Sequence, residues 1–214
     1  MKFTKARILL LVVCVLWLSA TGVGVGLLWD YENTPGTASA APAQWPEASR
    51  LRRSADGATL VLLAHPHCPC TRASLGELSR LMAQAEGRVT AYVLFVKPRG
   101  FAVEWEKTDL WSSAEAIPGV RVVRDDEGVE AGRFRAATSG QVTLYDREGR
   151  LLFSGGITSA RGHEGDNAGR AAIVSLLHTD EAGLDETPVF GCPLFAQSDE
   201  CQTGKEVGHA RDEH

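Results

Sequence analysis

One stretch near the amino terminus, from Ile8 to Trp29, is apolar and carries no charged side chain. As a helix it is long enough, at about 1.5 Å per residue, to cross a hydrocarbon core of ~30 Å. Backbone polar groups in lipid must be paired within the segment, so such a run can span a membrane only as a helix. We therefore predict a transmembrane anchor at residues 8–29, preceded by a cytoplasmic basic stub at residues 1–7.

The charges that flank this run predict its orientation. Lys2, Lys5 and Arg7 precede it, and Asp30 and Glu32 follow it. The positive-inside rule then keeps the amino terminus in the cytoplasm and exports the rest of the chain, as in a single-pass protein of the inner (cytoplasmic) membrane with a periplasmic domain. The alternative is a cleavable signal peptide, because Ala38-Ser39-Ala40 and Ala41-Pro42-Ala43 have the small residues of cleavage sites. Either reading places the later cysteines in an oxidising compartment.

The exported part divides by composition into three segments. Residues 30–54 are rich in Pro, Ala, Ser and Thr and predict a flexible tether. Residues 55–180 carry the periodic apolar patterns of a folded domain, and residues 181–214 form a tail that contains Cys192 and Cys201. The net charge of −5 and the lack of a basic stripe argue against nucleic acid as a partner.

Within the domain, strand and helix patterns alternate. Strands are predicted at 59–64, 88–97 and 120–123, and helices at 72–84, 104–116 and 128–134. A hairpin follows at 141–145 and 150–154, and a last helix starts near Asn167. This order predicts an α/β domain with a mixed central sheet flanked by helices.

The sequence His65-Pro66-His67-Cys68-Pro69-Cys70-Thr71-Arg72 lies between the first predicted strand and the first domain helix. The thiols therefore stand at a helix amino terminus, where the helix dipole and free N–H groups lower a thiol pKa and favour the thiolate. We expect redox or metal chemistry here. The alternative is a pair of structural cysteines.

The pairing of the thiols stays open. A disulfide needs Cα atoms about 4.4–6.8 Å apart, and a Cys68–Cys70 ring with one residue between its cysteines closes only with strain. Strained disulfides exchange readily, so one thiol could instead pair with Cys192, or both could hold a metal. Apolar residues on both sides of Cys192 favour docking of the tail at the thiols, whereas a Cys192–Cys201 disulfide would make the tail structural.

Both ends of the hairpin supply further candidates. The segment entering it contains Gly140, and the segment leaving it contains Arg161 and His163. If this end of the sheet faces the cysteines, Arg161 could stabilise a thiolate and His163 could act as a base or ligand. The alternative is that both are solvated loop residues.

These motifs, from about Ser54 to His178, resemble the thioredoxin-like superfamily. The similarity is greatest to its membrane-tethered branch, which includes cytochrome-maturation thioredoxins, peroxiredoxin-like proteins and Sco copper chaperones, and the chain also resembles proteins labelled RedB. The resemblance rests on 60–72, Val123-Arg-Asp-Asp-Glu-Gly and 141–151. It implies a thioredoxin-like fold, with Cys68 attacking, Cys70 resolving, and Thr71 and Arg72 beside them. The chain departs from the pattern in its one-residue spacer and in Gly140, which stands where thioredoxins have a cis-proline.

Two functions follow as the main hypotheses. The first is a thiol–disulfide oxidoreductase without a cofactor, whose partners are exported proteins with thiols or disulfides. The second is a copper-binding or metallochaperone protein, with ligands drawn from Cys68, Cys70, His65, His67 and His163. A peroxide reductase ranks lower because the chain has no Thr-x-x-Cys arrangement at the site, and a binding module with inert disulfides is the remaining alternative.

Overall fold

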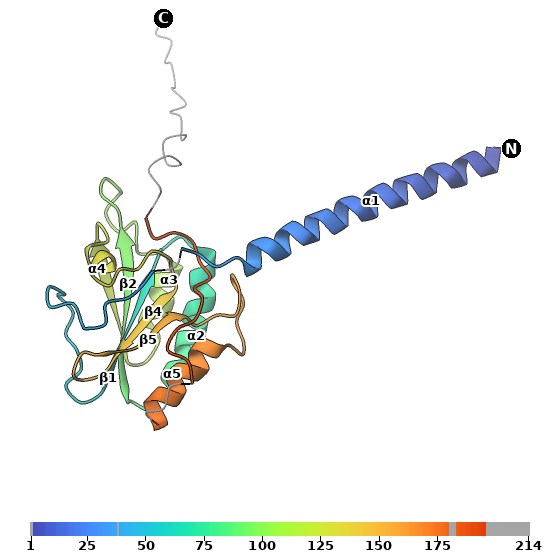
Figure 1. Ribbon diagram of the computed structural model, residues 1–214. Helices are drawn as coiled ribbons and strands as arrows, with labels where there is room; N and C mark the ends of the chain where they lie inside the picture. The colour runs from blue at the N-terminus through green and yellow to red at the C-terminus, as the bar shows by residue number, and fades with distance from the viewer. Residues whose placement is uncertain (1, 38, 180–182, 196–214) are drawn as a thin grey trace, which may run out of the picture.

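The computed structural model describes residues 2–37, 39–179 and 183–195. A long amino-terminal helix precedes a domain in which strands and helices alternate (Figure 1). The elements are α1 (Lys2–Asn33), β1 (Ala58–Ala64), α2 (Pro69–Gln84), β2 (Val89–Lys97), α3 (Asp109–Glu115), β3 (Val120–Asp126), α4 (Val129–Arg133), β4 (Gln141–Tyr145), β5 (Leu151–Gly156) and α5 (Ala168–Thr179).

The strands form one mixed sheet in the order β3-β2-β1-β4-β5. β1 is parallel to β2, which is parallel to β3, whereas β4 is antiparallel to both β1 and β5. Leu63 of β1 pairs with Gln141 of β4, so the end of β1 and the start of β4 share one sheet edge. The predicted mixed sheet is confirmed, and this edge is the one at which the cysteine motif follows β1.

Each face of the sheet packs against its own apolar cluster. On one face, alternate residues of the strands, such as Leu60 and Leu62, pack with residues of α2, α3 and α5. On the other face, Val61 and Leu63 pack with α4 and with Leu51, and Leu194 of the carboxy-terminal segment belongs to the same cluster. The central strands are therefore buried on both faces, as their continuous apolar sequence predicts.

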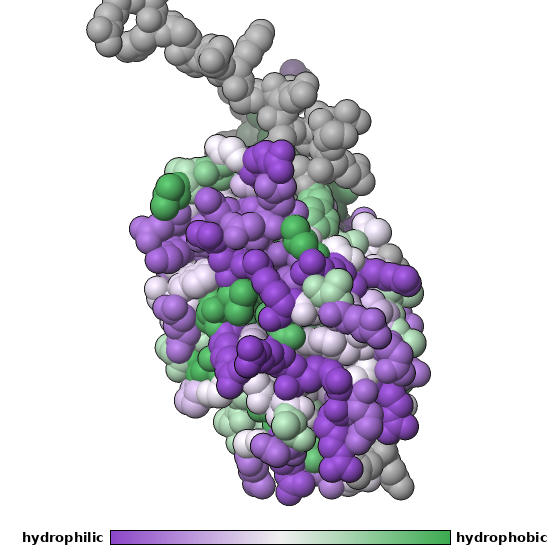
Figure 2. All heavy atoms as spheres, turned by 90° about the vertical axis from the view of Figure 1, so that its left-hand side faces the viewer, coloured by the Kyte–Doolittle hydropathy of each residue, from purple (hydrophilic) through white to green (hydrophobic). Residues whose placement is uncertain are grey.

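Helix α1 contrasts with the surface of the domain. Its apolar side chains are exposed along its length, and it projects away from the domain (Figure 1). Hydrophilic residues dominate the domain face shown in Figure 2. The segment Thr4–Asn33 is apolar and long enough to cross a membrane, a property shared by membrane anchors and signal sequences.

Several described residues of the segment 30–54, predicted to be a flexible tether, lie against the domain. Backbone bonds join Trp45 N to Gly149 O and Leu151 N to Ala43 O. The Trp45 ring packs edge-on against Phe134 and Tyr145, whose hydroxyl donates to a carbonyl of this segment. The half-buried Trp45 ring and these hydrogen bonds hold the segment against the domain, although its composition is that of a linker.

The bounds of one helix and one strand differ from those predicted from the sequence, and nearby contacts explain both differences. The helix expected at 104–116 starts only at Asp109, because Glu104 has a positive φ of 68° and Thr108 supplies the N-cap. Strand β3 continues to Asp126, and the buried Asp125 carboxylate accepts hydrogen bonds from the N–H groups of Glu130 and Ala131. These bonds satisfy the first turn of α4.

Candidate functional site

Three thiols meet at the edge where β1 ends. Cys68 is the N-cap residue of α2, with extended backbone (φ −86°, ψ 119°), and Pro69 begins the helix, so Cys70 lies in its first turn. Cys68 and Cys70 are buried and Cys192 is half-buried. The Sγ atoms of Cys68 and Cys192 are 2.7 Å apart, and all three sulfur atoms lie within 4.8 Å of one another.

Cys192 reaches this place on an extended segment, residues 185–195, which we call the strap. The strap first runs beside β5, where Ser154 N donates to Asp185 O and Thr187 N donates to Ser154 O. It then continues to the sheet edge at which α2 begins (Figure 1). The proximity of Cys192 to the Cys68–Cys70 motif agrees with the docking that the apolar residues around Cys192 predict.

Beyond β5, the strap pairs with the segment that enters β4. Ser139 N donates to Cys192 O and Leu194 N donates to Ala137 O, both at 2.8 Å. Thr138 and Pro193 form an antiparallel bridge between these two bonds. Leu194 is 2% exposed and inserts into the apolar cluster that contains Leu63. The backbone of Cys192 is therefore fixed on both sides.

The three cysteines differ in pKa because of their mutual hydrogen bonds and their burial. Hydrogen bonds from the thiols of Cys192 and Cys70 hold the pKa of Cys68 far below its ordinary value, against the opposing effect of burial. The hydrogen bond to Cys68 raises the pKa of Cys192, and burial adds to this. For Cys70, a hydrogen bond with Cys192 lowers the pKa, but the hydrogen bond to Cys68 and burial outweigh it. The lowered pKa favours the thiolate form at Cys68 over the other two cysteines.

Thr71 and Ser139 join the cysteine turn to the start of β4. The Thr71 and Ser139 hydroxyls are 2.9 Å apart and share a hydrogen bond, and Ser139 Oγ also accepts from His65 N at 2.8 Å. Thr71 Oγ1 lies 3.2 Å from His65 O, to which it donates. These bonds connect the turn to the segment that pairs with the strap.

The two histidines of the motif pack with an aromatic side chain from the loop after β2. The Trp105 ring centroid lies 4.4 Å from that of His67 and 5.6 Å from that of His65. Burial lowers the pKa of His65, against the opposing effect of Cys68. Among the described residues, the group with metal-ligand geometry contains the three cysteines and neither histidine.

Arg161 lies between the strap and the end of α1. Its Nη1 donates to Gly191 O, and its guanidinium lies 5.0 Å from the Tyr31 ring centroid. The backbone N–H of Arg161 donates to the backbone carbonyl of Glu32 at 3.0 Å. Its charge acts to lower the pKa of Cys70, although burial and Cys68 keep that pKa raised overall. His163 is exposed and lies 3.9 Å from the Glu32 carboxylate.

The other predicted neighbours of the thiols serve the scaffold. Arg72 is exposed and pairs with Asp109 at the start of α3. Gly140 has a φ of 90°, a backbone conformation that favours glycine, and a Cβ there would displace the Ser74 hydroxyl, which would lie 2.8 Å away. Cys201, predicted as a possible partner of Cys192, lies outside the described residues.

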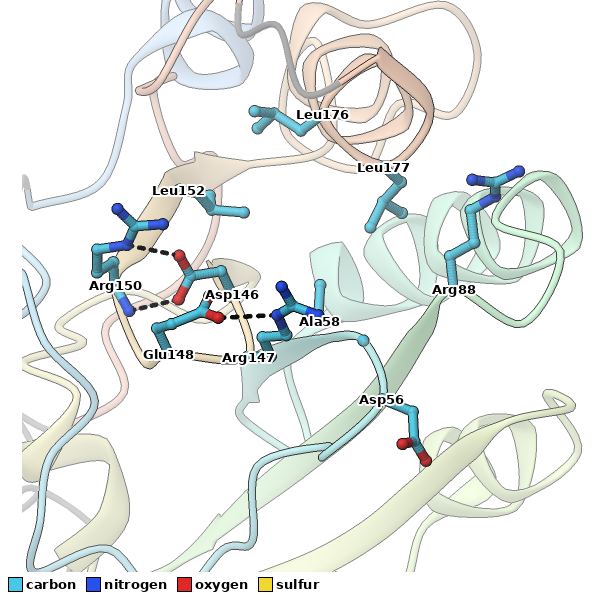
Figure 3. A pocket seen from close by; sticks show the side chains of 11 residues that line it. Asp56, Ala58, Arg88, Asp146, Arg147, Glu148, Arg150, Leu152, Leu176 and Leu177 are labelled. Atoms are coloured by element: carbon cyan, nitrogen blue, oxygen red, sulfur yellow. Dashed lines mark hydrogen bonds and ion pairs between the residues drawn. The ribbon is translucent and has the colours of Figure 1, made fainter.

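An open pocket lies at the other end of β1. It has a volume of about 730 Å³ beside Ala58 and the turn between β4 and β5, with Leu152, Leu176 and Leu177 on its apolar side (Figure 3). Most of its charged groups pair locally, as in the bond from Arg150 to Asp146 (Figure 3). It is separated from the thiols by the length of the strand.

The sequence does not predict the contacts of three residues at the site. Ser139 lies in the segment that enters the hairpin and Trp105 lies in a loop, and neither position carries a motif that predicts a contact with the cysteine turn. Glu77 stands among the charged residues of an amphipathic helix, yet it is buried and accepts from Gly165 N, Asn167 Nδ2 and Arg170 Nη1. Through these bonds Glu77 fixes the loop that carries Arg161.

Comparisons with known proteins give structural matches only. No family model and no curated protein matches the chain. A hypothetical protein from Sinorhizobium meliloti matches with a TM-score of 0.55 and 22% identity over 75% of this chain and 93% of that one. An uncharacterized conserved protein from Geobacillus kaustophilus matches with a TM-score of 0.55 and 19% identity over 78% and 94%. The exposed lipoprotein thioredoxin of Streptococcus pneumoniae matches with a TM-score of 0.44 and 15% identity over 65% and 98%.

In this chain the sheet has the order β3-β2-β1-β4-β5 with β4 and β5 as an antiparallel hairpin, and the cysteine motif lies at the amino end of the helix after β1. The resemblance to RedB-labelled proteins stays a prediction. The chain has a thioredoxin-like fold, preceded by one long apolar helix.

Proposed function

We propose that this protein is a thiol–disulfide oxidoreductase in which Cys68 attacks and Cys192 resolves. The observation that carries the proposal is the 2.7 Å separation of the Cys68 and Cys192 sulfur atoms. A lowered pKa at Cys68 and a raised pKa at Cys192 support this division of roles, because the thiolate is the attacking species in exchange.

In the reductive direction, the Cys68 thiolate attacks one sulfur of a substrate disulfide and expels the other as a thiolate. The product is a mixed disulfide between Cys68 and the substrate. The Cys192 sulfur then attacks Cys68 Sγ, passing its proton to the departing substrate thiolate, and a Cys68–Cys192 disulfide forms. The substrate gains two electrons, and an external dithiol must return them to the protein. Run backwards, the same steps oxidise a substrate dithiol.

Cys70 and Arg161 are assigned supporting roles. The Cys70 thiol donates a hydrogen bond that lowers the Cys68 pKa. It is also close enough to compete with Cys192 as the resolving thiol. Arg161 holds the Gly191 carbonyl, which is adjacent to Cys192. The proposed substrates are exported proteins with thiols or disulfides, met outside the cytoplasmic membrane by a domain anchored through α1.

The test uses the full-length chain in detergent. The reduced protein is mixed with a disulfide-bonded protein substrate, and substrate thiols are counted over time. Cys68→Ser should abolish reduction, and the double variant Cys70→Ser with Cys192→Ser, which has no second thiol beside Cys68, should accumulate the mixed disulfide. Cys14→Ser, a change in α1 far from the site, is the matched control and should leave the rate unchanged. Equal rates for Cys68→Ser and the unaltered protein would reject the proposal.

A second candidate function is binding of Cu(I), supported by the donor set. Three cysteine sulfur atoms within 4.8 Å of one another, deprotonated on metal binding, suit a soft monovalent copper ion. Cys68, Cys70 and Cys192 would supply these ligands, and the histidines of the motif would lie outside them. Anaerobic titration with Cu(I) should give one tightly held ion in the reduced protein and none after oxidation. Unaltered copper binding by Cys192→Ser would exclude this ligand set.

A further inference from the structure

The strap occupies the place where an extended protein segment would reach Cys68. It pairs antiparallel with residues 137–139 and presents its own cysteine to the Cys68 sulfur. The addition of an extended segment to an exposed backbone edge is a common mode of peptide recognition. Here that edge is already filled by the same chain.

The contacts of the strap restrict which residue types fit at the positions around Cys192. A Cβ at Gly191 would collide with the Ser139 carbonyl oxygen, so the position before the cysteine accepts only glycine. The two backbone bonds use Cys192 O and Leu194 N, so the residue between them needs no N–H group and can be proline. The second position after the cysteine inserts an apolar side chain into the core, as Leu194 does.

We infer that the strap is an intramolecular pseudosubstrate, and that protein substrates dock on residues 137–139 as extended Gly-Cys-x-Leu-like segments after displacing it. This inference rests on the proposed function and names the substrate class of the same site. Displacement and return of the strap also order the reaction. A substrate must remove the strap to reach Cys68, and the returning strap carries Cys192 to the mixed disulfide and takes the place of the product.

A peptide probe tests this directly. The peptide Thr-Pro-Val-Phe-Gly-Cys-Pro-Leu-Phe copies residues 187–195 and carries an aromatic thiol in disulfide linkage on its cysteine. Attack by the Cys68 thiolate forms the Cys68–peptide disulfide and releases the coloured aromatic thiolate. The full-length protein is used with Cys70→Ser and Cys192→Ser throughout, so that the strap stays in place without its thiol.

Gly191→Ala should unseat the strap because its Cβ meets Ser139 O. Loss of two backbone hydrogen bonds should speed the reaction with the peptide by about tenfold or more. Gly183→Ala is the matched control, because a Cβ there has no neighbour within 4 Å, and it should leave the rate unchanged. A peptide with alanine in place of its glycine should react with the Gly191→Ala protein about tenfold more slowly than the original peptide.

The outcomes separate the two levels of the argument. If neither the peptide nor a small aromatic disulfide reacts with Cys68, the proposed function itself fails. If the small disulfide reacts but Gly191→Ala and Gly183→Ala proteins treat the peptide alike, the pseudosubstrate inference fails. Hydrogen exchange at the Ser139 and Leu194 amides provides the second measurement. Gly191→Ala should lower their protection, and unchanged protection together with an unchanged rate would overturn the inference.

Discussion

Replacing Cys192 by alanine should raise the pKa of Cys68. The hydrogen bond from Cys192 is the largest cause of the lowered Cys68 pKa, and its sulfur is 2.7 Å away. A hydrogen bond to a charged group contributes about 1.5–3 kcal/mol, and about 1.4 kcal/mol corresponds to one pKa unit. The Cys68 pKa should therefore rise by about 1–2 units.

The assay is the rate of alkylation by iodoacetamide as a function of pH. The full-length chain carries Cys70→Ser, so that the Cys68 peptide contains one thiol, and modification is followed by mass spectrometry. Because the thiolate is the reacting form, a higher pKa moves the rise in rate to higher pH. Below the new pKa the variant should react more slowly than its parent.

Two further variants make the result specific. Cys192→Ser keeps a hydroxyl donor and should shift the pKa less than alanine does. Cys14→Ala removes a cysteine from α1 and should cause no shift. An unchanged pH profile for Cys192→Ala would refute the claim that Cys192 stabilises the Cys68 thiolate.

Three other predictions concern the supports of the site. Glu77→Gln should lower the free energy of unfolding, measured with urea, by about 3 kcal/mol, because it removes the charge from a buried ion-pair network. The control Glu148→Gln, on the surface, should change it by less than about 1 kcal/mol. Equal losses of stability in the two variants would contradict the prediction. Arg161→Gln should raise the pKa of Cys70, because it removes a nearby positive charge. The rate of Cys70 alkylation as a function of pH measures this pKa, and an unchanged value would contradict the prediction. Leu194→Ala should slow formation of the strap disulfide and lower the free energy of unfolding by about 2–4 kcal/mol, and peptide mapping after brief oxidation should recover less cross-link than in the parent.

The order of strands and helices was predictable because periodic apolar residues record which faces are buried. The thiols were predictable as a group as well, since Cys68 follows a buried strand and Cys192 stands between apolar residues. The packing of residues 34–54 was not, because proline, alanine and serine have the same composition in a free linker and in a docked one. Glu77 was also hidden, since a buried carboxylate looks like a solvated one until the groups that donate to it are placed. Three of those donors, Gly165, Asn167 and Arg170, lie far along the chain.

The contacts of Arg161 link cleavage of the amino-terminal segment to the reactivity of the thiols. Proteolytic maturation after Ala40 would remove Tyr31 and Glu32 from Arg161, and it would remove Gly36, whose N–H donates to Val189 O of the strap. The mature fragment would keep every cysteine of the site but lose part of what holds the strap down. A processed protein would therefore be the more open and reactive form, and an unprocessed one would be restrained by its own leader.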